Sequence, residues 1–317
     1  MTRRQHTALK RCVTGAASGL HRAALVAVLG TGLAAADGWV PVGGPLFTAH
    51  RLTAPARFTG NAEGPEFTRD GRLFVVNCER DGTVCEVHPD GRVEVLVTLP
   101  AGSTANAIRE DSRGYLLLAD FTGHNVLRLD PRTRQVSVWV HDDRFSQPND
   151  LAISRADVVY ASDPDWARGT GRIWRIATDG TVTPVGGGLG TANGIALSPD
   201  ERTLYVAESV QRRILAFALD AAGHAAGTPH VFAEFPDHGL DGIKCDASGR
   251  LFVTRYGKGT VAVLDAAGRV EREVAFPGKS VSNVVFGGPD GRRVFVTLQD
   301  TRDMHWFATD VPGARAR

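Results

Sequence analysis

The sequence predicts an all-β fold, a six-bladed β-propeller, from three observations. The 317 residues include 36 glycines, many of them in Asp-Gly pairs. Asp-Gly turns between short apolar runs are typical of antiparallel hairpins. Six segments also share one plan, a polar residue followed by an apolar run, a turn and an alternating strand, at the low-forties period of four-stranded propeller blades. A pair of β-sandwiches, the alternative, would not explain that period.

Residues 1–36 predict a secretory signal peptide. They contain five basic residues and no acidic one, and end in the apolar stretch Ala23 to Ala36. A basic start, a short apolar run and a small-residue cleavage site are typical of such signals. The Arg3-Arg4 pair leaves twin-arginine export open beside the general pathway, and a disordered basic tail is the alternative. We therefore expect a single mature domain, residues 37–317, that is periplasmic or secreted.

The charge of the predicted mature domain is mildly negative. Without the five basic residues of the signal, 31 basic residues remain against 35 acidic ones, a net charge of −4. The sequence contains no basic stripe or run, which argues against nucleic acid as a partner. We expect a small-molecule substrate and no membrane contact after signal removal, while the oligomeric state is open.

Two of the four cysteines form a candidate disulfide. Cys78 and Cys85 flank Asp81-Gly82, and a two-residue turn there would place them opposite each other in a hairpin. An exported protein could oxidise that pair. Two unlinked cysteines are the alternative, because directly cross-strand disulfides are often strained. Cys245, within an apolar strand pattern, is expected to be a buried free thiol.

Each repeat predicts an innermost strand and the strands that follow it. The second strands are expected at 72–76, 115–120, 158–163, 203–207, 250–254 and 293–297. Third strands are expected to include 172–176, 213–217 and 260–264. The last repeat lacks one strand, and residues 47–52 have strand character before the first repeat. We expect this N-terminal strand to complete blade six, which leaves the ring without an open edge.

The polar residues that open the repeats predict a site in the central channel. They are spaced by 43, 43, 44, 48 and 42 residues and are Glu63, Asn106, Asn149, Asn193, Asp241 and Asn283. Equivalent positions in a ring are related by its pseudo-sixfold axis, so residues that start the innermost strands surround the channel. All six offer oxygen acceptors, and two are carboxylates.

Two carboxylates converging in a narrow channel favour a bound cation. Burying each ion costs several kcal/mol unless it is neutralised. Oxygen ligands with a net charge of −2 suit Ca²⁺, with Mg²⁺, Mn²⁺ or Zn²⁺ as alternatives. In the competing interpretation, Glu63 and Asp241 pair with a loop cation such as Arg255, and the asparagines only cap turns.

A metal at a channel mouth predicts hydrolytic chemistry. Such an ion polarises a carbonyl or phosphoryl oxygen and acidifies bound water. Asp241 could then serve as general base or as nucleophile. No nucleophile elbow, zinc-protease helix, phosphate loop or dinucleotide fingerprint occurs in the sequence. His238, three residues before Asp241 in an expected mouth loop, is a candidate substrate contact, whereas the other isolated histidines are expected at the surface or in packing.

Five short motifs, in order and at blade spacing, carry a family resemblance over residues 45 to 310. They are Glu63-Gly64-Pro65, Pro148-Asn149-Asp150, Ala192-Asn193-Gly194-Ile195-Ala196, Leu240-Asp241-Gly242-Ile243, and Ser282-Asn283-Val284-Val285-Phe286-Gly287-Gly288-Pro289-Asp290-Gly291. The chain resembles the regucalcin/gluconolactonase family of six-bladed propellers, whose members hydrolyse sugar lactones and whose relatives cleave other esters or organophosphates.

The resemblance implies roles for individual residues. Glu63, Asn193 and Asp241 would be metal ligands, Asn149 a ligand or substrate contact, and Asp241 the catalytic residue. Asn106, Asn283, His238 and Arg255 complete the expected substrate contacts around the channel. Gln147 departs from the family pattern, because some sugar-lactone enzymes have arginine near that position, and the loop at Asp165-Trp166 also differs.

Two classes of function follow from these predictions. The first is an exported, Ca²⁺-dependent hydrolase of a lactone or related small ester, with an organophosphate or aryl-ester hydrolase as a variant that uses the same site. The second is a non-catalytic propeller in which Ca²⁺ is structural and the loops bind a ligand or protein. Because specificity resides in loops, the sequence does not name the substrate.

Overall fold

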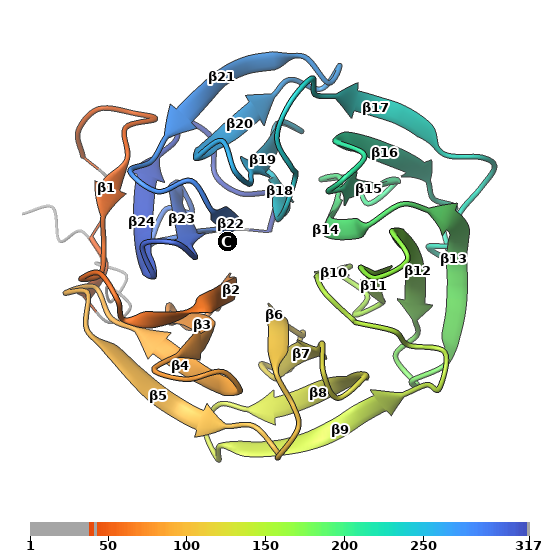
Figure 1. Ribbon diagram of the computed structural model, residues 1–317, viewed down its shortest axis with the longest axis horizontal. Helices are drawn as coiled ribbons and strands as arrows, with labels where there is room; N and C mark the ends of the chain where they lie inside the picture. Colours follow the sequence, from red (N-terminus) through yellow and green to blue (C-terminus); the bar gives the residue numbers. More distant parts are fainter. Residues whose placement is uncertain (1–37, 41–42, 316–317) are drawn as a thin grey trace, which may run out of the picture. The chain divides into compact units, whose positions relative to one another are not determined.

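The computed structural model describes residues 38–40 and 43–315, which form six four-stranded antiparallel sheets around a central axis (Figure 1). The predicted six-bladed propeller is therefore confirmed, while the predicted signal peptide, 1–36, lies outside the described residues. Within the part described, no helix is long and apolar enough to cross a membrane.

Each of the first five blades runs outward from the channel in chain order, so that consecutive strands pair. Blade one contains β2 (Phe58–Phe67), β3 (Leu73–Cys78), β4 (Thr83–Val87) and β5 (Val93–Thr98). Blade two contains β6 (Ala105–Glu110), β7 (Leu116–Asp120), β8 (Asn125–Asp130) and β9 (Gln135–His141). Blade three contains β10 (Leu151–Ile153), β11 (Val159–Asp165), β12 (Thr170–Ile176) and β13 (Val182–Leu189).

The remaining blades follow the same plan until the last strand. Blade four contains β14 (Ala192–Leu197), β15 (Thr203–Glu208), β16 (Arg213–Ala218) and β17 (His230–Glu234). Blade five contains β18 (Ile243–Cys245), β19 (Leu251–Arg255), β20 (Thr260–Leu264) and β21 (Val270–Ala275). Blade six contains β22 (Val281–Gly287), β23 (Arg293–Leu298), β24 (Asp303–Ala308) and, from the other end of the domain, β1 (His50–Arg51).

The N-terminal strand closes the ring as predicted. β1 pairs antiparallel with β24, with His50 opposite Trp306 and Arg51 opposite His305. The strand is only two residues long, shorter than the expected 47–52, but the Phe47 amide also donates to the Ala308 carbonyl at 2.7 Å. The first and last segments of the domain thus share blade six, and unfolding either one exposes the edge of the other.

The apolar core lies between blades rather than along the axis. Six clusters of buried side chains each join two neighbouring blades. Between blades six and one, for example, Trp39 packs edge-on against Phe295 with ring centroids 5.0 Å apart. Aromatic contacts of this kind contribute about 1 kcal/mol beyond the area they bury. Because the blades hold one another in this way, the channel itself is free to carry polar residues.

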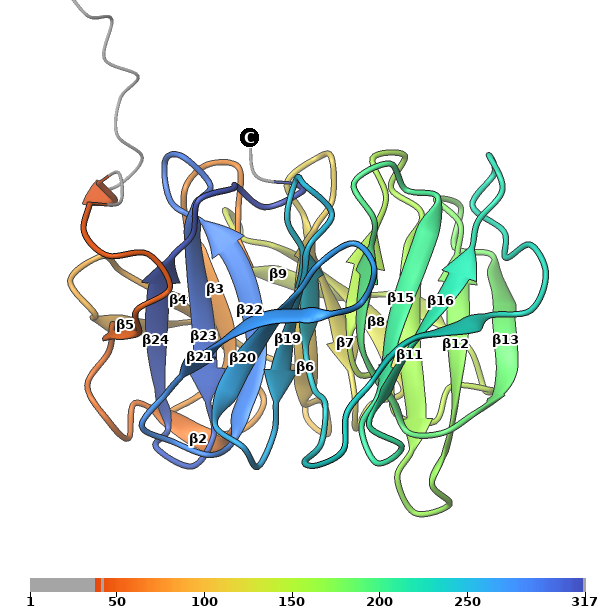
Figure 2. The same cartoon turned by 90° about the horizontal axis from the view of Figure 1, so that it is seen from above.

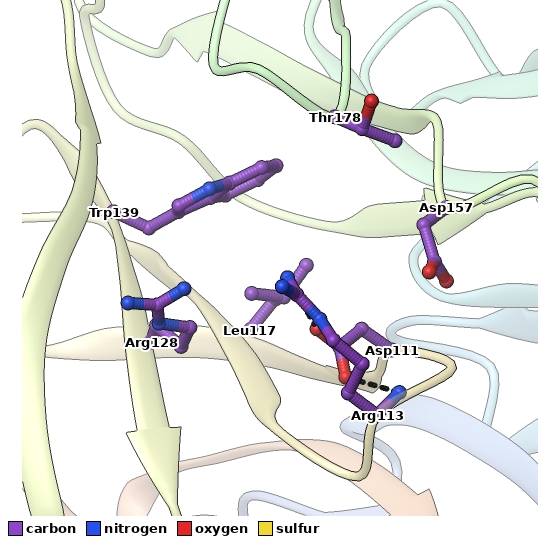
Figure 3. A pocket seen from close by; sticks show the side chains of 7 residues that line it. All are labelled: Asp111, Arg113, Leu117, Arg128, Trp139, Asp157 and Thr178. Atoms are coloured by element: carbon purple, nitrogen blue, oxygen red, sulfur yellow. Dashed lines mark hydrogen bonds and ion pairs between the residues drawn. The ribbon is translucent and has the colours of Figure 1, made fainter.

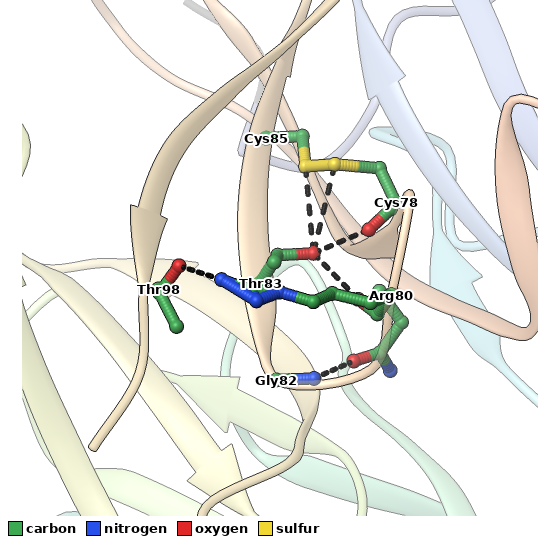
Figure 4. Close-up of a disulfide and its surroundings, with 7 residues drawn as sticks. Cys78, Arg80, Gly82, Thr83, Cys85 and Thr98 are labelled. Carbon is green, nitrogen blue, oxygen red and sulfur yellow. Dashed lines mark hydrogen bonds between the residues drawn. A yellow bond between two sulfur atoms is a disulfide. The ribbon is translucent and has the colours of Figure 1, made fainter. Parts of the chain in front are cut away.

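Cys78 and Cys85 form a disulfide with a Cα–Cα distance of 6.3 Å (Figure 4). The hairpin register differs from the prediction, because Cys85 lies opposite Val75 rather than opposite Cys78. The connection is wider than a two-residue turn: Asn77 and Glu79 have positive φ angles of 63° and 50°. The Asn77 side chain accepts a hydrogen bond from the Gly82 amide at 3.1 Å and so replaces strand pairing. Cys245 is a buried free thiol, as expected.

The two faces of the ring carry different connections. On the mouth face, the chain enters every innermost strand and turns from each second strand to the third. On the turn face, tight turns join first to second strands, and third to fourth strands in blades one, two, three and five, whereas residues 219–229 form a longer connection in blade four. The C-terminal segment crosses the turn face, where the Gly313 and Ala314 amides donate to Gly291 and Cys245. In Figure 2 the turn face is at the top and the mouth face is below.

Candidate active site

All six predicted channel residues lie on the innermost strands, which surround the channel in Figure 1, or two residues before them. Glu63, Asn106, Asn193 and Asn283 are within strands β2, β6, β14 and β22, whereas Asn149 and Asp241 precede β10 and β18 by two residues. Five of the six are buried, and Asn106 is partly exposed. Residues at the same position in the repeat therefore lie at equivalent positions around the ring.

Close backbone approach between neighbouring innermost strands explains two of the glycines. A Cβ at Gly194 would collide with the Asp241 carbonyl oxygen, and one at Gly242 would collide with the Asn283 side chain. Each glycine directly follows a channel residue, so its missing side chain lets the next blade's channel residue come close. The Asn-Gly and Asp-Gly pairs of blades four and five are thus requirements of the site's geometry.

Two amide–carboxylate pairs organise the mouth of the channel. Asn283 Nδ2 donates to Glu63 Oε2 at 3.0 Å, and the Gly64 amide donates to the same oxygen at 3.0 Å. Asn193 donates to Asp241 and also contacts Ser209 Oγ at 3.1 Å. Asn283 and Asn193 therefore fix the orientation of the two carboxylates without contributing positive charge.

Both carboxyl groups are shifted toward the protonated form. The pKa of Glu63 is raised to about 7, because burial raises it, hydrogen bonds from Asn283 and Gly64 only partly oppose the rise, and the Asp150 carboxylate adds to it. Burial also raises the pKa of Asp241 well above its ordinary value, and repulsion from Glu63 and Asp150 adds to this. Desolvation combined with a second carboxylate is the physical cause in both cases. In the absence of a cation, the pair resists holding two negative charges.

The donor set at the mouth fits a hard divalent cation. Within the described ranges 38–40 and 43–315, neither Glu63 nor Asp241 forms an ion pair with Lys, Arg or His, and no group of three His, Cys, Asp or Glu side chains gathers to hold a metal ion. The side-chain neighbours of these two carboxylates include the carboxamides of Asn283 and Asn193, which also have oxygen atoms. Carboxylates with neutral oxygen donors suit Ca²⁺ or Mg²⁺ better than Zn²⁺, which favours imidazole and thiolate.

A second charged cluster lies further along the channel, at the buried Asp150. Asp150 Oδ1 accepts from Arg109 Nη2 at 2.7 Å and from the Leu151 amide at 2.8 Å. Asp150 Oδ2 accepts from Lys244 Nζ and from the Ile195 amide, both at 3.3 Å. Every lone-pair direction of this carboxylate is therefore engaged by side chains or backbone of blades two to five.

Charge is balanced in this second cluster. Arg109 also lies 3.6 Å from Glu66, so two carboxylates face two cations. Burial lowers the pKa of Lys244 to about 8, with repulsion from Arg109 adding to the shift and Asp150 opposing it. Lys244 is thus still a cation near neutral pH, and the cluster carries no net charge.

The prediction missed these residues, although the repeats contain the signal. Three positions after each leading polar residue, the six blades read Glu66, Arg109, Ala152, Ala196, Lys244 and Phe286. Two cations and one acid at that position predict an ion-paired layer. One position after the leading residues, Asp150 is the single charged residue among glycine, alanine and valine.

Arg255 is not the counter-ion of Glu63 or Asp241, so that competing interpretation is wrong. Its side chain is only 1% exposed, stacks over Phe235 with its guanidinium carbon 4.0 Å from the ring centroid, and forms ion pairs with Asp237 and Glu273 at 2.6 and 3.5 Å. Its role as a substrate contact stays a prediction. His238, by contrast, lies at the rim with 40% of its side chain exposed and φ of 50°.

A separate cavity of about 270 Å³ opens on the turn face between blades two and three (Figure 3). Its lining includes Arg113, Arg128, Trp139 and Asp157. None of the predicted site residues lines it. The cavity is distant in the fold from the mouth of the channel and does not belong to the candidate active site.

Comparison with known proteins connects this geometry to a family. Residues 61–300 match the family described as SMP-30/Gluconolactonase/LRE-like region. The chain is 28% identical over 272 residues to a gluconolactonase of Zymomonas mobilis, covering 74% of this chain and 75% of that protein. It is 28% identical over 242 residues to lactonase drp35 of Staphylococcus aureus, covering 70% and 72%.

A solved structure agrees with the fold. The calcium-binding protein regucalcin of Agrobacterium tumefaciens superimposes with a TM-score of 0.75 at 24% identity, covering 85% of this chain and 97% of that one. The family match spans all six channel residues and part of every blade, from Glu63 to Asn283. By its sequence and its fold, this chain belongs to the SMP-30/gluconolactonase/LRE-like family.

Proposed function

We propose that this protein is a divalent-cation-dependent hydrolase, with Ca²⁺ as the cation, that opens a lactone or cleaves a related small ester. The observation that carries the proposal is the buried pair Glu63 and Asp241, which has amide partners but no cationic side chain. The lactonase names of the relatives support the same reaction class. A charge-balanced site would have favoured a purely structural channel.

Glu63, Asn193 and Asp241, with Asn149 beside them, are the residues that would hold the cation. When bound, a divalent cation polarises the substrate carbonyl and lowers the pKa of water. Glu63 keeps its orientation through Asn283, so its carboxylate stays aimed into the channel. Ser209 in turn accepts a hydrogen bond from Asn193, which keeps that amide in place.

Asp241 would act as the general base. Burial and the neighbouring carboxylates raise its pKa, so it binds a proton more readily than an ordinary aspartate. It takes a proton from the attacking water as oxygen bonds to the carbonyl carbon. The ring C–O bond then breaks, and the proton passes from Asp241 to the departing alkoxide oxygen. Direct attack by Asp241 as nucleophile is the competing role.

The test is hydrolysis of a panel of γ- and δ-lactones by the mature protein, before and after chelation. We expect turnover to be lost on chelation and restored by Ca²⁺, with circular dichroism showing that the metal-free protein is still folded. Full activity in thoroughly metal-free protein would overturn the cation requirement. Calcium binding without turnover of any lactone, aryl ester or organophosphate would instead support a binding module.

We also propose that the protein is exported. The basic and apolar leader, residues 1–36, and the Cys78–Cys85 disulfide support this location, because disulfides persist in oxidising compartments. Fractionation of cells that make the full-length chain, followed by N-terminal sequencing of the mature form, tests it. Recovery of the intact chain from the cytoplasm would contradict the proposal.

A further inference from the structure

Three exposed apolar side chains occupy equivalent loops on the mouth face. Trp166, Val210 and Tyr256 are 39%, 65% and 38% exposed, and each lies where a second strand turns into the third, in blades three, four and five. The other large exposed apolar residues are in the N-terminal segment or on the outermost strands β9, β17 and β21. Because they recur in three successive blades, Trp166, Val210 and Tyr256 form an arc, which we call the apolar arc. Figure 2 shows the β11–β12 loop of this arc projecting from the lower face.

The equivalent loops on the other side of the mouth are polar. Blade one presents the exposed residues Glu79, Arg80 and Asp81, and blade six presents Asp300 and Arg302. Blade two presents Thr122 and His124. The mouth of the channel is therefore divided into an apolar half over blades three to five and a polar half over the remaining blades.

Two loops of the apolar arc are bonded to segments that carry the channel residues of blades three and five. The Trp166 amide donates to Gln147 Oε1 at 3.2 Å, and Gln147 lies two residues before Asn149. The Gly239 amide donates to the Tyr256 carbonyl at 3.0 Å, and Gly239 lies two residues before Asp241.

The third loop is bonded to the site directly. Ser209, the neighbour of Val210, accepts a hydrogen bond from Asn193 at 3.1 Å and donates to the Leu240 carbonyl. The arc is thus continuous with the three channel residues Asn149, Asn193 and Asp241. A ligand with its reactive group in the channel would have its remaining atoms within reach of the arc.

We infer that the substrate carries an alkyl or aryl substituent that lies over the apolar arc while its lactone or ester group enters the channel. The inference rests on the proposed function and narrows its substrate class to hydrophobic lactones, in place of polyhydroxylated sugar lactones. A hydroxyl-rich ring needs a hydrogen-bonding partner for each buried hydroxyl, whereas Trp166, Val210 and Tyr256 offer mainly apolar surface on this side. Burial of each CH₂ on such a surface raises affinity by about 2- to 4-fold.

The experiment is a series of γ-lactones with alkyl chains of zero to seven carbons, beside a polyhydroxylated lactone of the same ring size, in saturating Ca²⁺. We expect kcat/KM to rise by about 2- to 4-fold per CH₂ over the first few carbons. The triple variant Trp166→Ala/Val210→Ser/Tyr256→Ser should flatten this dependence and reduce the value for the longest lactone by about tenfold or more. Its activity on the unsubstituted lactone should stay within about twofold of wild type.

A matched control separates the arc from general surface hydrophobicity. Val138→Ser/Val231→Ser/Val270→Ser removes three exposed apolar side chains from outermost strands and should keep the chain-length dependence. The corresponding alkyl γ-lactams, which resist hydrolysis, provide a binding readout through protein fluorescence. Lactam affinity that rises with chain length and falls in the triple variant, in a protein that opens no lactone, would support the apolar arc as a binding surface. The same result would overturn the hydrolase proposal.

Two results would overturn the inference while leaving the hydrolase intact. One is a preference for the polyhydroxylated lactone with no dependence on alkyl chain length. The other is a wild-type dimer in sedimentation that becomes monomeric in the triple variant, because the arc would then be an interface between copies of the chain.

Discussion

The channel contains two layers of buried charge that differ in how the charge is balanced. At the mouth, the partners of Glu63 and Asp241 among the described residues are neutral amide, hydroxyl and backbone donors. One strand residue further along, Asp150 binds Arg109 and Lys244 directly. The deeper layer combines residues one and three positions after the leading ones, and both layers are largely buried, so burial and polarity do not distinguish them. The two layers differ in whether their charge is balanced by protein side chains.

This difference shows which layer is complete in the protein alone. An ion pair whose partners are all side chains holds blades together and needs no further component. Two carboxylates without a cation are destabilising by several kcal/mol, and that cost is offset only when a ligand supplies the charge. The mouth layer therefore has the character of a binding site, and the deeper layer that of a structural cross-link.

The largest expected effect is the loss of turnover when a carboxylate of the mouth layer is replaced. Asp241→Asn removes the proposed base while keeping the shape and the hydrogen bond to Asn193, so kcat should fall by about 10³-fold or more. Asp237→Asn, the same change at a rim carboxylate that is 49% exposed, is the matched control and should have little effect on kcat. Lactone turnover of both variants in Ca²⁺ checks this, with melting curves to confirm folding. An Asp241→Asn enzyme with wild-type kcat would remove Asp241 from the chemistry.

The deeper layer predicts an effect on stability instead. Asp150→Asn leaves Arg109 and Lys244 buried without their carboxylate, which should lower the free energy of unfolding by about 3 kcal/mol. Urea unfolding measures this loss. Lys244→Met alone should cost less, and combining it with Asp150→Asn should cost less than the two single losses added, because the variants share one interaction. Strict additivity would mean that the pair is not coupled.

The fold was predictable because the six repeats indicate both the number of blades and the order of strands within each blade. The second strand expected at 250–254 is Leu251–Arg255, and the strand expected at 260–264 is found unchanged. The outermost strands β5 and β9 were not placed from the sequence, although valines alternate along both, and both strands are half exposed. The Cys78–Cys85 hairpin was predicted with the wrong register, because the Asn77 side chain bonds the loop backbone, which no spacing rule shows.

The candidate site was predictable only as far as the first residue of each repeat. Those six positions follow from the symmetry of the ring. Arg109 and Lys244 lie three residues later and were missed because only the leading positions were compared. The competing pairing of Arg255 with Glu63 or Asp241 was wrong because several carboxylates compete for its guanidinium, and the choice of Asp237 and Glu273 depends on distances in the folded chain.

The smallest expected effect is a change in the free energy of unfolding of about 1 kcal/mol per pH unit. It tests directly whether the mouth layer lacks a positive charge of its own. In metal-free protein the folded-state pKa of Glu63 is about 7, above the ordinary value of 4.5. Folding therefore favours the protonated form, so this contribution to stability is fully present below about pH 4.5 and is lost as the pH rises toward 7.

The stability of dialysed, metal-free protein should accordingly decrease across this window, as measured by urea unfolding at a series of pH values. Glu63→Gln, which cannot ionise, should show a shallower decrease. Saturating Ca²⁺ should reverse the trend, because the cation binds the deprotonated carboxylates and stabilises the folded state increasingly as the pH rises. Curves that keep the same slope with and without Ca²⁺ would show that the cation does not bind at Glu63, and the mouth layer would then need another source of positive charge.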